Sequence, residues 1–384
     1  MVYTIGNQYY GVMTMTTPVY FTSKIATDAS FCNRTEERAI IIQSIQKNQH
    51  LVIVAPRRYG KTSLVVNTLT RHDIIFARID LFCVVYEDEI CRKVAKGVSQ
   101  LIRKITPFST KSLQLIGQCF KLSTIAVKAG DVEIKAELNK NTSDPTESLE
   151  DLLEGLEKLA KKQKKAIVLF FDEFQDVLKT ESSDKIQAAI RAIAQHSQYV
   201  TYIFSGSSRA MLNKIFDDKK QPLYMLCKKI LLTRIDKIHF SAHIISAFSK
   251  RFKKNSSVEL IELILSKTEC HSYYVNVLCD KLWEGKTMPS TEDVENAWQE
   301  TLNENKGKII SDLEPLNTNK LKVLSTIAQL NYIKEPNSKY FLDHVKLPLS
   351  STQNAIKYLL NYDFIFKTEN GLTLVDPVMK LFLN

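Results

Sequence analysis

The sequence has no long hydrophobic run, no closely spaced cysteine pair and no internal repeat. Its longest strongly apolar stretch, residues 166–171, has six residues, whereas a membrane-spanning helix needs about 20, so we expect no contact with a membrane. The start of the chain has neither a basic stretch nor a continuous apolar one, and a secretory signal is therefore not expected. The seven cysteines are scattered and odd in number. They favour reduced thiols in a cytoplasmic protein over a zinc site or a disulfide framework.

The composition is that of an ordinary globular protein. Apolar residues make up 44% and charged residues 24% of the 384 residues, which excludes a mostly disordered or fibrous chain. At about 150 residues per domain, the length predicts two or three domains. The 52 lysines and arginines exceed the 42 acidic residues by ten. This excess permits an anionic partner, either nucleotide phosphates or nucleic acid, but is more often simply a basic surface.

A phosphate-binding motif stands early in the chain. Residues 55–62 read APRRYGKT, close to the P-loop pattern G-x-x-x-x-G-K-[ST], and they lie between a predicted strand and a predicted helix. Lys61 is expected to act in catalysis at the β- and γ-phosphates, and Thr62 to offer its hydroxyl to Mg²⁺. Alanine replaces the first glycine, which the loop tolerates if φ is negative there. The expected nucleotide contacts are Ala55, Pro56, Arg57, Arg58, Tyr59, Gly60, Lys61, Thr62 and Ser63.

A second motif provides acidic residues for the same site. Residues 167–173, IVLFFDE, form a predicted buried strand that ends in two acids, which is the Walker B pattern. Asp172 would hold Mg²⁺ through water, and Glu173 would polarise the attacking water, the role that separates a hydrolase from a protein that only binds nucleotide. At the end of the next predicted strand, Ser207, with Ser205 as its competitor, is a candidate to touch the γ-phosphate or that water. The alternative for Ser207 is a helix cap.

Predicted strands and helices alternate through the first part of the chain. This pattern predicts an α/β fold whose parallel sheet has helices on both faces. Only helices are predicted in the next part, and the last part combines three helices with a hairpin around Asn370 and Gly371, which is typical of a winged helix-turn-helix. The expected division is an extended N-terminal segment at 1–30, a P-loop ATPase domain at 31–238 with a β-hairpin insertion at about 108–146, a helical lid at 239–310 and a winged helix-turn-helix domain at 311–384.

With these pieces in this order, the chain resembles the archaeal-type ATPases of the STAND branch of AAA+ P-loop NTPases. The resemblance runs from about residue 18 to 383 and rests on PRRYGKTSL, FFDEFQ, FSGSSRAML, HSYYVNVLCDKLWE and the winged helix. It implies a Mg²⁺-dependent switch that binds ATP and ADP, hydrolyses ATP slowly or with a partner's stimulation, and moves its lid and winged helix with nucleotide state. It also implies that Asn33 and Arg34 lie near the adenine and ribose. Where family members often carry Gly-x-Pro, this chain has His271, which either reaches the nucleotide or is a helix-cap or core histidine.

The sequence leaves two alternatives open: which arginine senses the γ-phosphate, and what the output of the switch is. Arg191, Arg209 and Arg234 are the candidates, Arg191 being taken as the catalytic one, and each is equally explained as a solvated charge. The output could be homo-oligomerisation, an unknown protein partner or DNA. Residues 311–384 carry eight lysines and no arginine against seven acids, which supports DNA binding only weakly. The alternative function is a nucleotide-sensing, DNA-binding regulator with little hydrolysis.

Overall fold

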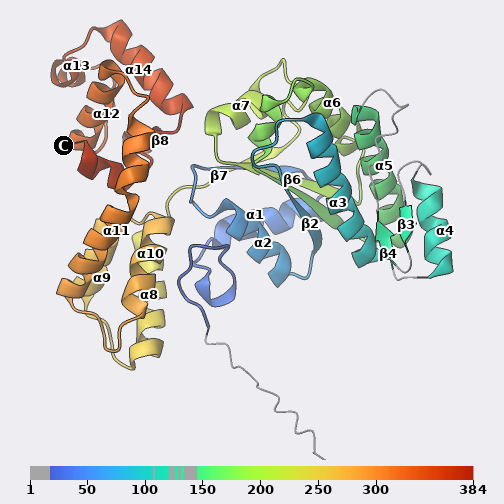
Figure 1. Cartoon of the computed structure of the whole chain (residues 1–384), viewed down its shortest axis with the longest axis horizontal. Helices are drawn as coiled ribbons and strands as arrows, with labels where there is room; N and C mark the ends of the chain where they lie inside the picture. Colours follow the sequence, from blue (N-terminus) through green and yellow to red (C-terminus); the bar gives the residue numbers. More distant parts are fainter. Residues whose placement is uncertain (1–17, 107–108, 121–125, 129–130, 134–144, 384) are drawn as a thin grey trace, which may run out of the picture.

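The computed structural model describes residues 18–106, 109–120, 126–128, 131–133 and 145–383 (Figure 1). Most of the predicted N-terminal segment and the turn of the predicted insertion hairpin therefore lie outside the described residues. The strands are β1 (Leu51–Val54), β2 (Ile75–Asp80), β3 (Ala126–Lys128), β4 (Asp131–Glu133), β5 (Ile167–Asp172), β6 (Val200–Gly206), β7 (Lys228–Leu231), β8 (Ile365–Thr368) and β9 (Gly371–Leu374).

Helices connect the strands and make up most of the second half of the chain. The short 3₁₀ helices are η1 (Asp28–Ser30), η3 (Phe174–Lys179) and η4 (Pro377–Phe382). The α-helices are α1 (Thr35–Gln46), α2 (Lys61–Arg71), α3 (Glu87–Ile105), α4 (Thr110–Cys119), α5 (Pro145–Gln163), α6 (Ser183–Ala194), α7 (Arg209–Asp217), α8 (Lys237–Phe252), α9 (Val258–Thr268), α10 (Ser272–Trp283), α11 (Thr291–Leu313), α12 (Thr318–Leu330), α13 (Lys339–Val345) and α14 (Leu349–Asn361).

Five parallel strands form the central sheet in the spatial order β2-β5-β6-β1-β7. This confirms the predicted α/β fold with a parallel sheet. The strand before the P-loop, β1, does not pair with β5, which carries the acidic motif, because β6 lies between them. Parallel strands end at the same edge of a sheet, so the P-loop, Asp172 and the segment after β6 come together at that edge.

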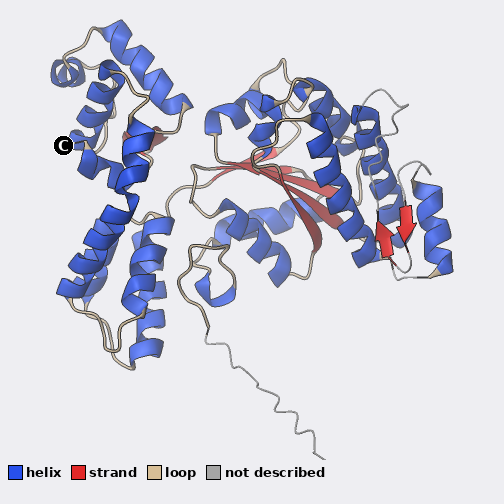
Figure 2. Cartoon of the chain, in the orientation of Figure 1, coloured by secondary structure: helices blue, strands red, loops and turns tan. Residues whose placement is uncertain are grey.

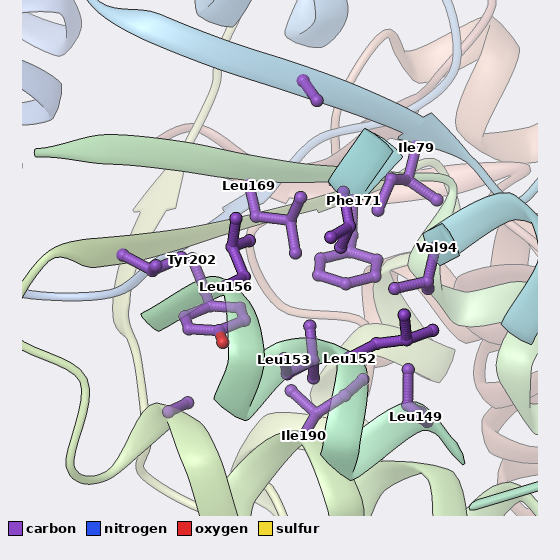
Figure 3. Close-up of a cluster of buried hydrophobic side chains, with 14 of the residues drawn as sticks. Ile79, Val94, Leu149, Leu152, Leu153, Leu156, Leu169, Phe171, Ile190 and Tyr202 are labelled. Atoms are coloured by element: carbon purple, nitrogen blue, oxygen red, sulfur yellow. The ribbon is translucent and has the colours of Figure 1, made fainter. Parts of the chain in front are cut away.

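Side chains of the central strands alternate between two hydrophobic cores. Leu51 and Ile53 pack on the face that α1 and α2 cover, whereas Val52 and Val54 pack on the face of α3, α5 and α6. Figure 2 shows helices on both faces of the sheet, and Figure 3 shows part of the second core, including Leu156 of α5. Because both faces are buried, the strands read as continuous apolar runs in the sequence.

The sequence did not place two short helices: α4, which precedes the antiparallel pair β3–β4 in the insertion, and α13, which is one of the three helices expected in the winged helix. Both helices have two or three turns, too few for a clear hydrophobic period. Each begins at a serine N-cap: Ser109 accepts from the amide of Ser112, and Ser338 from the amide of Phe341. These caps are the signal that the sequence offered.

The lid helices and the winged helix share one hydrophobic core. Helix α11 runs unbroken through the expected boundary at 310/311, and Trp298 on one side and Leu324 on the other belong to the same buried cluster. Phe21 of the N-terminal segment joins this core through edge-on contacts with the rings of Phe248 and Trp283, each at 5.8 Å between centroids. Among the helices in the described ranges, none is both long and apolar enough to cross a bilayer.

We expect Leu156→Ala to destabilise the protein by about 2–5 kcal/mol, because it removes a fully buried side chain and leaves a cavity in the core. Urea denaturation followed by circular dichroism measures the effect. The matched control, Lys158→Ala on the same helix, removes an exposed side chain that pairs with Glu154 and should cost less than about 1 kcal/mol. Equal effects of the two substitutions would contradict the assigned core.

Candidate nucleotide-binding site

The P-loop joins β1 to α2 and surrounds the ammonium group of Lys61. Gly60 is the N-cap of α2 with φ of +86°, a conformation that favours glycine. Ala55 does not have a positive φ, so alanine fits at the first glycine position. Lys61 is buried, and its Nζ donates to the carbonyl oxygens of Ala55 at 3.1 Å and Pro56 at 3.0 Å. Burial lowers the pKa of Lys61, while the two carboxylates of the acidic motif oppose that shift.

Asp172, the last residue of β5, is buried with its carboxylate fully hydrogen-bonded. Thr62 Oγ1 donates to Oδ2 at 2.7 Å, which connects α2 to β5. Arg78 of β2 donates Nε to the same oxygen at 2.9 Å and forms an ion pair with it at 2.8 Å. Ser205 of β6 and the amide of Glu173 donate to Oδ1. Side chains from α2, β2 and β6 thus converge on one carboxylate.

The oxygens of Thr62 and Asp172 fit a magnesium site. Both are hard ligands that already lie 2.7 Å apart, and Mg²⁺ usually takes few protein ligands and fills its shell with water and substrate phosphates. The guanidinium of Arg78 places a positive charge against Asp172, so this carboxylate is already neutralised by a cation. In the described part of the chain, no group of three or more His, Cys, Asp or Glu residues forms a metal cluster. A bound nucleotide would therefore have to supply the remaining ligands.

Glu173 begins η3 in the left-handed conformation, with φ of +53°. Its Oε2 accepts hydrogen bonds from Ser207 Oγ at 2.7 Å, from the Ser207 amide at 3.2 Å and from Gln175 Nε2 at 2.7 Å. Ser207 therefore does not cap α7, whose N-cap is Ser208, but restrains Glu173. Its competitor Ser205 holds Asp172 instead.

A cavity of about 390 Å³ lies against the P-loop and Glu173 and is bounded by the N-terminal segment and by α10 of the lid. The N-terminal segment is tied to both walls. The amide of Ala26 donates to Ser63 Oγ at 2.9 Å, and the amide of Thr22 donates to Asn276 Oδ1 at 3.2 Å. The volume falls in the range of about 300–1,000 Å³ that is usual for small-ligand sites.

Of the two residues expected near the adenine and ribose, Arg34 lines this cavity and Asn33 does not. Arg34 is buried and donates Nη2 to the carbonyl oxygens of Thr233 at 2.7 Å and Tyr59 at 3.3 Å, so it also connects α1 to the P-loop. Asn33 Oδ1 accepts from the hydroxyl and the amide of Thr35, at 3.0 and 3.4 Å, and serves the start of α1.

His271 precedes α10 and lies behind the P-loop, outside this cavity. It is 2% exposed, its ring meets the ring of Tyr59 edge-on at 5.2 Å, and its Nδ1 has no hydrogen-bond partner among the described residues. Burial, followed by the positive charges of Arg234 and Arg58, lowers the pKa of His271 to about 3. The ring is therefore neutral near pH 7 and contacts the P-loop through Tyr59.

The three candidate arginines lie in two different places. Arg191 of α6 donates to two backbone carbonyls in the segment 222–224 and lines a separate pocket with residues that precede β1, so the structure does not bring it to the P-loop. Arg209 pairs with Asp363 of the winged helix at 2.7 Å. Arg234 bonds to the lid and to the end of β9. Arg209 and Arg234 thus connect the core to the lid and the winged helix.

Sequence reasoning missed Arg78 and Gln175, which touch the two acids. Arg78 is the fourth residue of β2, whose side chains are otherwise apolar up to Asp80. A charged side chain inside an apolar strand needs a counter-charge, and this is the signal that could have identified it. No comparable pattern marks Gln175, which lies in a 3₁₀ helix directly after the acidic motif.

The burial of His271 predicts that stability depends on pH. Because folding lowers its pKa from 6.5 to about 3, the unfolded chain binds one more proton between these values, and stability falls by about 1.4 kcal/mol per unit as pH drops below about 6.5. We expect His271→Gln to lose less stability between pH 6.5 and 5, measured by urea denaturation. The control His196→Gln, at an exposed histidine, should lose as much stability between pH 6.5 and 5 as the unsubstituted protein does. An unchanged slope in His271→Gln would contradict a buried neutral ring.

Solved structures share this fold. The Walker-type ATPase PABY2304 of Pyrococcus abyssi superposes with a TM-score of 0.68 at 20% identity and covers 95% of this chain and 99% of that chain. The ORC2 protein of Aeropyrum pernix, solved in ADPNP–ADP complexes, has a TM-score of 0.58 at 13% identity and covers 93% and 94%. No curated protein matches the sequence.

A family model described as a probable winged helix domain matches residues 310–384. It agrees with the three helices and the β8–β9 hairpin at this end of the chain. Together, the sheet order, the P-loop and these likenesses show that the chain has the fold of a Walker-type P-loop ATPase that ends in a winged helix, as the sequence predicted.

Proposed function

We propose that this chain binds ATP and ADP with Mg²⁺, hydrolyses ATP and acts as a STAND-type nucleotide-dependent switch. One observation carries the proposal: Lys61, Thr62, Asp172 and Glu173 meet at one edge of the sheet beside a cavity of ligand size. A P-loop with an acidic pair in this place can both hold a triphosphate and activate water.

The P-loop would hold the phosphates. Backbone amides at the start of α2 point to one place, and the helix dipole favours negative charge there. Lys61 now donates to two carbonyl oxygens of its own loop, and phosphate oxygens would replace these acceptors. Thr62 and Asp172 would hold Mg²⁺, which neutralises charge on the phosphates. The base and ribose would lie between Arg34, the N-terminal segment and α10.

Glu173 would take the proton of the attacking water. Its left-handed backbone turns it out of β5, next to the P-loop cavity. Ser207 and Gln175 both donate to Oε2, which restrains the carboxylate and leaves Oε1 for a water molecule. Ser207 is in this proposal a positioning residue, since it acts through Glu173.

Tyr59 would transmit the nucleotide state. It belongs to the P-loop and is buried, and its ring meets His271 of the lid and Phe366 of the wing edge-on, at 5.2 and 6.2 Å. Arg234 lies beside the Tyr59 hydroxyl and also donates to the carbonyl of Leu374. A change in the P-loop on phosphate binding would therefore alter contacts with both the lid and the winged helix.

We expect Lys61→Ala to weaken ATP binding by at least about tenfold, because it removes a charge-assisted contact to the phosphates. Glu173→Gln should keep ATP affinity but lower turnover by about 10²–10⁴-fold, because the amide cannot accept the proton. Titration calorimetry and phosphate release measure the two effects. The control is Glu181→Gln, which changes an exposed glutamate that follows the acidic motif in the chain. Unchanged turnover in Glu173→Gln would refute its role.

The position of Ser207 leads to a second expectation. Ser207→Ala should lower kcat by about tenfold with little change in KM, because Glu173 loses a hydroxyl donor while the nucleotide contacts stay. Ser207→Thr keeps a hydroxyl and should restore most of kcat. The neighbouring Ser208→Ala is the control, since Ser208 makes no side-chain cap bond. Equal loss in the alanine and threonine variants would mean that packing, not the hydroxyl, matters.

A further inference from the structure

A second cavity, of about 700 Å³, lies on the other side of the P-loop. Its walls come from the P-loop, the segment after β6, α7, α11 and the segment between α14 and β8, so the cavity lies between the ATPase core and the lid and winged helix. Figure 1 labels these helices and strands. It shares Arg58 with the first cavity but does not reach Lys61, Thr62 or Glu173. It is therefore not the cavity that would hold the base and ribose, although Ser207 and Gln175, which hold Glu173, also line it.

Three exposed cations line this second cavity. Arg57 and Arg58 enter from the P-loop and Lys308 from α11, and in the described part of the chain none of them forms an ion pair. The Arg57 guanidinium has only a long contact, 3.5 Å from Nε to Ser207 Oγ. Arg58 stacks on the ring of Tyr273 at 3.8 Å, which holds its position but leaves its hydrogen-bond donors free for a ligand.

The acidic residues of the wall are bound to other partners. Asp176 pairs with Lys179, at 2.9 Å. Asp363 pairs with Arg209, and Asp376 accepts from the hydroxyl of Tyr274 at 2.9 Å. The remaining wall carboxylate, Asp312, lies one turn from Lys308 on α11. Four carboxylates are thus present, but three are already engaged.

Two further observations indicate that an anion is lacking. His271 lines this cavity, is 2% exposed, and its buried Nδ1 has no partner among the described residues. Partial burial lowers the pKa of Lys308, and the charges of Arg58 and, to a smaller extent, Arg57 lower it further, although the carboxylates of Asp312 and Asp376 oppose the shift. The positive charges of the two arginines thus act on Lys308 across the cavity.

We propose that the second cavity binds the phosphate end of a small phosphorylated molecule, held by Arg57, Arg58 and Lys308 with His271 at its base. Guanidinium groups match the geometry of phosphate oxygens, and the volume is that of a small-ligand site. The side chains of Met211, Phe364 and Met379 provide an apolar wall for the organic part. The position of the cavity between the core and the winged helix favours a small molecule over a nucleic acid.

This ligand would bridge two parts of the protein. Arg57 and Arg58 belong to the ATPase core, whereas Lys308 belongs to the helix that joins the lid to the winged helix. A phosphate bound to all three would stabilise the arrangement in which these parts are in contact. The site is an effector site, and it does not require that the P-loop hydrolyse ATP.

Pyrophosphate is the probe, and the full-length protein is first saturated with ADPNP and Mg²⁺ so that the P-loop and its γ-phosphate position are filled. Titration calorimetry should then show one further pyrophosphate bound per chain. Lys308→Ala should weaken this binding by about tenfold, because one charge-assisted contact is lost, and Arg57→Ala should do the same. The matched control Lys306→Ala removes an exposed lysine of the same helix and should leave pyrophosphate affinity unchanged.

The ADPNP affinity of each variant is measured separately, so failure of the P-loop site and failure of the second site are distinguishable. Absence of pyrophosphate binding to the ADPNP-saturated protein would overturn the proposal, as would an equal effect of Lys306→Ala. Binding of a short DNA duplex that Lys308→Ala weakens, without binding of pyrophosphate, would assign the surface to nucleic acid and also overturn it.

Discussion

The buried negative charge of Asp172 is the constraint on which the edge of the sheet depends. A carboxylate that is 1% exposed costs several kcal/mol unless donors surround it, and here they come from Thr62, Arg78 and Ser205. These three residues stand on α2, β2 and β6, so their convergence requires the observed strand order. With β6 between β1 and β5, the P-loop and the acidic motif are spaced by one strand.

The same edge is tied to the rest of the molecule through Tyr59. Tyr59 precedes Gly60, which has a left-handed conformation, and its ring contacts His271 of the lid and Phe366 of the wing. Phe366 and Val375 of the winged helix belong to the same buried cluster as the side chains of β1. The P-loop is therefore packed between a rigid sheet and a part of the chain more than 300 residues away in sequence.

Much of this could be read from the sequence because it depends on local patterns. The five strands follow from apolar runs, and the P-loop and acidic pair follow from residue spacing. The partners of these residues do not follow from local patterns, because the tertiary fold determines which side chains meet. Arg78 meets Asp172 only because β2 pairs with β5, and His271 lies behind the P-loop because α10 packs there. The catalytic role of Arg191 stays a prediction: the structure places it away from the P-loop of its own chain, and helical position alone does not tell which end of the sheet a side chain reaches.

The winged helix illustrates how burial limits function. The base of its hairpin packs against the ATPase core, where Phe366 is 7% exposed and Arg209 donates to both Asp363 and the carbonyl of Ile365, whereas Glu369 and Asn370 at the turn are exposed. DNA docking on the base of this hairpin would first have to break those bonds. The helix α14 carries one lysine, Lys357, and no arginine. Its contacts with DNA phosphates would therefore offset little of the free energy lost with those bonds. The described contacts thus hold the winged helix against the ATPase core.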